Sequence, residues 1–224
     1  PKDEVKMTNL DDLKGHIIKA LDDNLGCILL TGSRVRGEER EDSDYDLAII
    51  VKKIDEKVLT ELRNIFSGIT NYSVYLLDDG DLMMLPKAQF LQFVYSEKIY
   101  GNFDYALPSK LDVANYIESI RRDWLDRIRH YLVVPHPHER LIKALIPALK
   151  CVYLSLSYLI YGETGHLPMT RKDTIAFLRK KGGNPLGMNL MEILEDWDSS
   201  KEKQLTNPIE LLLQIEAFFR TIEI

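Results

Sequence analysis

Apolar residues recur along the chain at two different spacings, and the spacing changes near the middle. Between Leu10 and Leu25 they repeat every three or four positions, so we expect an amphipathic helix there. Thr8 or Asn9 is a suitable N-cap, and Gly26 is expected to stop this helix. The first element of the chain is therefore predicted to be helical.

Three short apolar runs follow, each bounded by glycine or polar residues. Cys27 to Thr31, Leu47 to Val51 and Tyr72 to Leu77 are aliphatic, β-branched or aromatic, which is typical of buried strands. Residues 56–66 carry apolar side chains at helical spacing and lie between the last two runs. Beyond them we expect a turn at residues 78–81, helical structure at 86–96, and the end of this half at 99–102.

After Ser109 the strand-like runs disappear and long helical patterns take over. Proline and glycine separate these patterns. We therefore predict an α+β fold, with a mixed sheet and flanking helices in residues 1–106, followed by an all-α bundle in residues 107–224. The four expected helices are Leu111 to Val133, Arg140 to Tyr161, Arg171 to Lys181 and Pro208 to Ile222.

The composition narrows the classes of protein that the chain can represent. Of its 224 residues 45% are hydrophobic, which is enough for a buried core without disulfides. The formal net charge is −6, so we expect no broad basic surface for duplex nucleic acid. Cys27 and Cys151 lie in apolar runs and are expected to be buried thiols. A charged N-terminal segment, and no run of ~18 apolar residues, argue against a signal peptide or membrane span and favour the cytoplasm.

Two carboxylates stand at the start of the second apolar run. Asp44 and Asp46 are two positions apart, so in a strand their side chains point to the same face. Mg²⁺ binds such hard oxygen ligands together with substrate phosphates, and paired ions can hold the attacking and leaving oxygens of a phosphoryl displacement. Asp44 and Asp46 are therefore the candidate metal ligands and catalytic residues.

A glycine and a serine end the first apolar run. Gly32 lets the chain turn tightly and expose backbone N–H groups to an anion, and Ser33 adds a hydroxyl donor. Arg34 and Arg36 place positive charge beside the turn, and Gly37 is expected to end a short helical turn. The sequence therefore predicts a phosphate-binding turn close to the carboxylates.

Gly32-Ser33, ten further residues and then Asp44-x-Asp46 resemble the signature of the DNA polymerase beta nucleotidyltransferase superfamily. The resemblance covers roughly the first hundred residues. It is closest to small prokaryotic members, namely the antitoxin-type minimal nucleotidyltransferases and the aminoglycoside nucleotidyltransferases. The helical half resembles the C-terminal bundle of kanamycin-type members, which covers the nucleotide and helps to form the acceptor pocket.

The resemblance implies an enzyme that moves a nucleoside monophosphate to a hydroxyl group and releases pyrophosphate. Gly32 and Ser33 would hold the triphosphate of an NTP, expected to be ATP, and Asp44 and Asp46 would bind Mg²⁺ or Mn²⁺. The acceptor would be a small molecule or a protein, and a protein partner or homodimer stays open. Neither a membrane nor duplex nucleic acid is expected as a partner.

Many active members carry a third carboxylate on the next strand, and this chain has no obvious one. Ser73 or Tyr75 occupies the expected position, and Asp78 lies beyond it, where it is expected to cap a turn. One interpretation is that another carboxylate, such as one from the helical half, activates the acceptor. The others are a nucleotide-binding regulatory or antitoxin-like module with little catalysis, or a docking half of a larger complex. We favour activity because Asp44 and Asp46 are both present.

The helical half offers less specific candidates. Lys143 and Lys150 share a helix face and could reach a triphosphate, but we favour the simpler interpretation that they are ordinary surface lysines. Thr170 and Asp173 are three positions apart and are expected to form a capping box. Three histidines close to two prolines match no zinc spacing and are expected to be loop residues: His130, His136 and His138.

Overall fold

The computed structural model describes residues 9–39, 43–197 and 207–224. Within these ranges the chain forms two compact units, the first ending at Leu107 and the second starting at Pro108. Thr8 and the charged N-terminal segment lie outside the described residues. Asn9 is the N-cap of the first helix, because its side chain accepts a hydrogen bond of 2.9 Å from the Asp12 amide.

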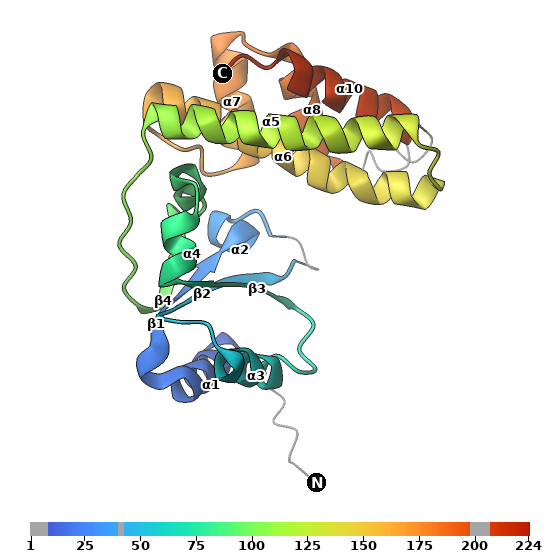
Figure 1. Ribbon diagram of the computed structural model, residues 1–224. Coiled ribbons are helices and arrows are strands. Elements are labelled where there is room, and N and C mark those ends of the chain that lie inside the picture. Colours follow the sequence, from blue (N-terminus) through green and yellow to red (C-terminus); the bar gives the residue numbers. More distant parts are fainter. Residues whose placement is uncertain (1–8, 40–42, 198–206) are drawn as a thin grey trace. The chain divides into compact units, whose positions relative to one another are not determined.

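The described residues of the first unit form a four-stranded mixed sheet with the strand order β3-β2-β1-β4 (Figure 1). β1 is antiparallel to both of its neighbours, whereas β2 is parallel to β3. The predicted α+β class, with a mixed sheet followed by a helical region, is confirmed. The strands are β1 (Leu25–Thr31), β2 (Tyr45–Val51), β3 (Tyr72–Asp78) and β4 (Glu97–Gly101).

Alternation along β2 sends its apolar side chains into two separate clusters. The odd-numbered residues after Tyr45 pack against α1 (Leu10–Leu21) and α3 (Glu56–Ile65), which lie together on one face of the sheet (Figure 1). The even-numbered residues from Ala48 onward join a smaller, aromatic-rich cluster on the other face. That cluster includes side chains from α4 (Asp79–Met84) and the 3-10 helix η2 (Lys87–Phe93).

The first helix ends earlier than the hydrophobic pattern predicts. α1 stops at Leu21, a 3-10 turn η1 (Asp22–Asn24) follows, and β1 already begins at Leu25. Gly26 therefore lies inside a strand, at a shift in the β1–β2 register, and does not stop the helix. A Cβ at Gly26 would lie 3.1 Å from the Ile50 carbonyl oxygen, so glycine allows the two strands to approach closely.

The pattern also misses two elements of the first unit. The turn expected at residues 78–81 is the start of α4, where Asp78 and Asp81 form a reciprocal capping box. Residues 99–102, which were expected to end the first half of the chain, overlap the edge strand β4. Because the residues of β4 are half-buried or exposed, the strand carries little apolar periodicity.

The described part of the second unit is helical. α5 and α6 form a long hairpin, α10 packs against both of them, and α8 packs against α6, α7 and α10 (Figure 1). The sequence pattern misses α8, although Asn184 and Pro185 provide its N-cap and its first residue. The helices are α5 (Lys110–Val133), α6 (His138–Thr164), α7 (Arg171–Lys181), α8 (Pro185–Glu195) and α10 (Pro208–Thr221).

α6 is both long and apolar. By length and composition it is the one candidate among the described residues for a membrane span, with 27 residues and a mean hydropathy of 1.5 in its most apolar window. However, 61% of that window is buried inside the protein. Its apolar residues are thus used to pack α5, α8 and α10 around it, as in the core of a helical bundle.

Leu149→Ala is expected to destabilise the second unit, because Leu149 is fully buried on α6 and truncation would leave a cavity. The free energy of unfolding should fall by about 3 kcal/mol. Both tryptophans of the chain, Trp124 and Trp197, lie in this unit, so their fluorescence during urea unfolding of the full chain reports on it. Leu213→Ala is the control, since Leu213 is 52% exposed on α10. Equal losses of unfolding free energy in the two variants would contradict the placement of Leu149 in the core of the second unit.

Candidate active site

β1 leads directly into a tight turn at Gly32 and Ser33. Gly32 has a φ of +79°, a left-handed conformation that favours glycine, and it begins the short helix α2 (Gly32–Arg36). The N-cap Thr31 makes no side-chain hydrogen bond to the start of α2. Gly37 ends α2 in a left-handed conformation, as the sequence predicts. The first N–H groups of α2 are therefore not capped by Thr31.

Asp46 packs against this turn. Thr31 and Asp46 are paired in the β1–β2 register, and Thr31 Oγ1 donates a hydrogen bond of 3.2 Å to the backbone carbonyl of Asp46. A Cβ on Gly32 would lie 1.9 Å from Asp46 Oδ2, so the carboxylate fills the space that a side chain would need. Asp44 stands immediately before β2 and is exposed, and Ser33 is half-buried. The fold thus brings Gly32 and the Asp46 carboxylate into direct contact.

Arg34 connects α2 to the segment that carries the two aspartates. Its Nε donates a hydrogen bond of 3.3 Å to the carbonyl oxygen of Asp44, and its Nη2 donates to that of Ser43. The guanidinium also lies 4.0 Å from the centre of the Tyr45 ring. Sequence reasoning treats Arg34 only as a positive charge, because nothing in the local pattern relates it to the distant Tyr45.

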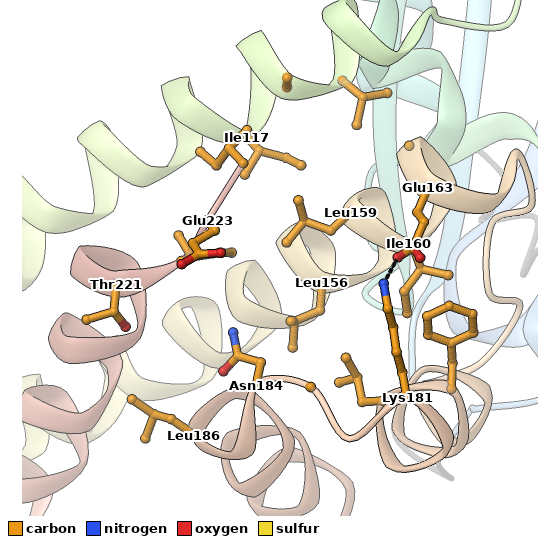
Figure 2. Close-up of a pocket in the computed structure, with 18 of the residues that line it drawn as sticks. Ile117, Leu156, Leu159, Ile160, Glu163, Lys181, Asn184, Leu186, Thr221 and Glu223 are labelled. Carbon is orange, nitrogen blue, oxygen red and sulfur yellow. Dashed lines mark hydrogen bonds and ion pairs between the residues drawn. The ribbon is translucent and has the colours of Figure 1, made fainter.

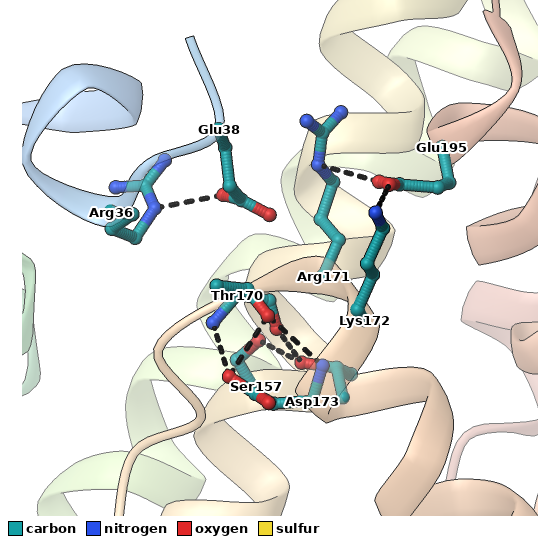
Figure 3. Close-up of polar contacts among 9 residues, drawn as sticks. Arg36, Glu38, Ser157, Thr170, Arg171, Lys172, Asp173 and Glu195 are labelled. Atoms are coloured by element: carbon teal, nitrogen blue, oxygen red, sulfur yellow. Dashed lines mark hydrogen bonds and ion pairs between the residues drawn. The ribbon is translucent and has the colours of Figure 1, made fainter.

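Arg36, the other arginine of α2, is engaged differently. Its Nε lies 3.0 Å from Glu38 Oε2, and the Glu38 carboxylate is largely buried (Figure 3). This pair holds the chain just after Gly37. Arg36 therefore contributes to the turn through Glu38, whereas Arg34 reaches back to the start of β2.

Ser73 occupies the position beside Asp46 on the neighbouring strand. In the parallel β2–β3 register Asp46 pairs with Ser73, and Ala48 pairs with Tyr75. Paired residues on adjacent strands project to the same face, so Ser73 rather than Tyr75 is the neighbour of Asp46. Of the two residues that the resemblance left as alternatives for the third carboxylate, the register therefore places Ser73 beside Asp46.

Asp78, the next acidic residue along β3, has a structural role. Its side chain accepts hydrogen bonds from the backbone N–H groups of Asp81, at 2.9 Å, and Ile54, at 3.1 Å. These backbone hydrogen bonds, chiefly the one from Asp81, hold the pKa of the Asp78 carboxyl below its usual range. The prediction that Asp78 caps the following segment is confirmed.

The predicted capping box of the helical half is also confirmed. At the start of α7 the Thr170 amide donates to Asp173 Oδ2 over 2.9 Å, and the Asp173 amide donates to Thr170 Oγ1 over 3.1 Å (Figure 3). Arg171 and Lys172 both contact the Glu195 carboxylate, at 3.3 and 3.7 Å. These contacts hold α7 against α8. Helix capping and helix packing therefore account for the polar residues at positions 170–173.

The sequence predicts that all three histidines are loop residues, but the structure places two of them in helices. His130 lies in the last turn of α5, His138 is the first residue of α6, and only His136 lies in the connection between them. The helix continues past His130 because Pro135 is the first residue that interrupts it. The His130 and His136 rings are 5.2 Å apart, and burial lowers the pKa of His136, with Arg140 and His130 adding to the effect. Lys143 and Lys150 are exposed on α6.

Asp44 and Asp46 would by themselves provide only part of a metal-binding shell. Among the described residues, no group of three or more His, Cys, Asp or Glu side chains is positioned to hold a metal ion. Two carboxylates beside a turn suited to phosphate would nevertheless suit a hard cation, which would complete its shell with phosphate oxygens and water. The donor set therefore fits Mg²⁺ or Mn²⁺ shared with a nucleotide better than a closed structural site.

The second unit contains a pocket of about 790 Å³, within the size range of small-molecule sites. Its lining is largely aliphatic, with Ile117, Leu156 and Leu159 among the residues around it (Figure 2). Its two acidic residues do not form a pair, because Glu163 contacts Lys181 and Glu223 lies on another side of the pocket (Figure 2). This pocket therefore does not repeat the chemistry of Asp44 and Asp46.

Comparison with known families identifies the first unit. Residues 16–93 match the family described as polymerase beta, nucleotidyltransferase. This segment extends from α1 through η2 and includes the Gly32-Ser33 turn and both aspartates. The chain thus contains a polymerase beta-like nucleotidyltransferase domain followed by a helical region, and the resemblance seen in the sequence is confirmed.

Among solved structures, the chain is similar to a spectinomycin adenyltransferase from Enterococcus faecialis, whose crystal structure contains ATP and spectinomycin. The TM-score is 0.53 at 13% sequence identity, and the similarity covers 94% of this chain and 98% of that chain. At this identity the similarity shows the fold alone. A search of curated proteins found no match.

Gly32→Ala is expected to displace the Asp46 carboxylate, because the new Cβ would collide with Oδ2. If this carboxylate binds metal, Mn²⁺ affinity measured by electron paramagnetic resonance should fall at least ~10-fold. Gly37→Ala is the matched control, since Gly37 is also left-handed but has open space around it. An equal loss in both variants would attribute the effect to backbone strain alone.

Proposed function

We propose that the protein is a metal-dependent nucleotidyltransferase that moves AMP from ATP to a hydroxyl group and releases pyrophosphate. The observation that carries this proposal is the contact of Gly32 with the Asp46 carboxylate, which joins a turn suited to phosphates and a carboxylate suited to metal in one site. The match of residues 16–93 to the nucleotidyltransferase family supports the reaction type. The similar adenyltransferase, solved with ATP, supports ATP as the donor.

In this proposal the residues of the site position the nucleotide and stabilise its charge. Asp44 and Asp46 hold Mg²⁺ or Mn²⁺, which when bound neutralises charge on the phosphate oxygens. Gly32 and Ser33 bind the triphosphate through backbone N–H groups and the serine hydroxyl. The acceptor oxygen forms a bond to the α-phosphorus as the bond to pyrophosphate breaks. Binding that aligns these atoms supplies much of the rate enhancement.

The acceptor is proposed to be a small molecule or a protein with an accessible hydroxyl. The similar adenyltransferase was solved with spectinomycin, which favours the small molecule. Because Ser73 is a poor base, another group has to take the proton of the acceptor hydroxyl, and a carboxylate of the helical part is our candidate. We assign residues 1–106 to the nucleotidyltransferase domain, residues 107–224 to a helical domain that serves the acceptor, and the protein to the cytoplasm. A protein partner or a homodimer is compatible with this assignment.

A nucleotide-binding regulatory module with little catalysis is the second candidate. It is favoured by Ser73, which places no carboxylate beside Asp46. Incubation with α-labelled ATP, Mg²⁺ or Mn²⁺ and a panel of hydroxyl acceptors separates the two functions. Label transfer with pyrophosphate release supports the enzyme. Tight ATP binding without either product across the panel supports the module.

Asp44→Asn and Asp46→Asn should each reduce label transfer by roughly 100-fold or more, because an amide does not supply the negative charge that holds the metal. The measurement is the initial rate of pyrophosphate release at saturating ATP. Asp11→Asn in the first turn of α1 is the control and should retain the wild-type rate. Near-normal rates in either site variant would refute the metal-binding role of that aspartate.

Ser73→Asp should raise the rate of transfer by roughly 10- to 100-fold, because it adds a potential base beside Asp46. Val74→Asp provides the matched control, since Val74 is also exposed but points to the opposite face of the sheet. The readout is the turnover number with the best acceptor of the panel. An unchanged rate in Ser73→Asp would show that the absence of a carboxylate beside Asp46 does not limit the reaction.

A further inference from the structure

Arg34 makes three contacts that all converge on the start of β2. Its guanidinium donates to the carbonyl oxygens of Ser43 and Asp44 and lies over the ring of Tyr45. The three contacted residues are consecutive, and Asp46 follows them directly. One side chain from α2 therefore holds the backbone on both sides of Asp44.

Tyr45 is itself anchored to the sheet. Its ring stacks on that of Tyr72, with 5.0 Å between the ring centres and 22° between the planes. Tyr72 is the register partner of Tyr45 on β3 and also contacts Phe66, at 6.1 Å between ring centres. The Tyr45 amide donates a hydrogen bond of 2.9 Å to the carbonyl oxygen of Asn71. Arg34 is thus the outer member of a stack that reaches β3 and the end of α3.

We infer that Arg34 is a positioning residue, which clamps the Ser43–Asp44 backbone against Tyr45 so that the Asp44 and Asp46 carboxylates converge on one metal. This inference rests on the proposed function for the role of the two carboxylates. Two carboxylates that face one ion repel each other before the ion arrives, so their backbone has to be held by other groups. Alternation along the strand turns Tyr45 to the face opposite that of Asp46. The clamp can therefore act from behind the site without occupying it.

The chemistry of arginine suits this task better than that of lysine. A planar guanidinium presents several N–H donors in a fixed arrangement and can stack on an aromatic ring at the same time. A lysine ammonium at this position would keep the charge but would not form the same fork of two hydrogen bonds over a ring. A direct phosphate contact by Arg34, in contrast, would depend mainly on its charge.

A double-mutant cycle on the full chain tests the inference, with Arg34→Met, Tyr45→Leu and the double variant. Hydrogen–deuterium exchange of a peptide covering residues 43–47 reports on the clamp, and Mn²⁺ titration followed by electron paramagnetic resonance reports on the site. The rate of AMP transfer from ATP provides kcat and the KM for ATP. Arg34→Lys tests whether charge suffices, Tyr45→Phe keeps the ring, and Arg63→Met removes an exposed arginine on α3 as a matched control.

The clamp predicts that Arg34→Met and Tyr45→Leu each accelerate exchange at residues 43–47 and weaken Mn²⁺ binding roughly 10-fold. The double variant should be little worse than either single one, because both changes break the same unit. Arg34→Lys should behave like Arg34→Met, while Tyr45→Phe and Arg63→Met should behave like the wild type. In the transfer assay kcat should fall more than the KM for ATP rises.

Different results would overturn the clamp. Unchanged exchange at residues 43–47 in Arg34→Met would show that the arginine does not hold this segment. A raised KM for ATP that Arg34→Lys restores, with Tyr45→Leu unaffected, would instead assign Arg34 to the phosphates. Failure of the proposed function has a separate signature, because the wild type would then bind no Mn²⁺ and transfer no label whatever the exchange of residues 43–47.

Discussion

The space that the missing side chain of Gly32 leaves beside the Asp46 carboxylate is the constraint on which the candidate site depends. Antiparallel pairing places Thr31 opposite Asp46, so the chain leaves β1 at the point where β2 begins. Gly32 then turns in a left-handed conformation with Asp46 Oδ2 where its Cβ would be. The turn proposed to bind phosphates and the carboxylate proposed to bind metal can meet only because residue 32 carries no side chain there.

The two apolar clusters of the first unit hold Gly32 and Asp46 in place. One face of β2 is buried under α1 and α3, and the other packs against an aromatic-rich cluster near η2. A slip of one residue in the register of β2 would exchange these two faces, so burial fixes the register strongly. The position of Asp46 beside Gly32, and of Ser73 beside Asp46, follows from the same register. Packing energy far from the site therefore determines its geometry.

Ser73 on β3 raises the question of which group removes the proton of the acceptor hydroxyl in the proposed reaction. With a carboxylate at that position, base and metal ligand would lie next to Asp46 on one sheet face. With Ser73, the proposed reaction requires another group to remove the proton of the acceptor hydroxyl. The acidic residue nearest in sequence, Asp78, is committed to the start of α4 and to the Ile54 amide. Its register partner is Val51 at the far end of β2, so Asp78 also lies too far along the sheet to stand beside Asp46.

Local chemistry allowed several features to be predicted from the sequence by itself. The left-handed stop at Gly37, the capping box of Thr170 and Asp173, and the cap at Asp78 each involve residues within one helical turn. The positions of β1 and β2 followed from continuous apolar runs that are largely buried, and β3 followed from a similar run although much of that strand is exposed. The edge strand β4 was missed, because its five residues include Glu97, Lys98 and Gly101 and form no such run.

Only the tertiary structure decided the features that depend on pairing between distant segments. Sequence left Ser73 and Tyr75 as equal alternatives, and the β2–β3 register chose Ser73. The sequence likewise identified Arg34 only as a positive charge. The fold places its guanidinium over the Tyr45 ring and within hydrogen-bond distance of the Ser43 and Asp44 carbonyl oxygens. The sequence by itself thus determined which groups this site possesses, because motifs are local. Their mutual positions required the sheet, because register and packing arise from contacts between segments that are far apart in the chain.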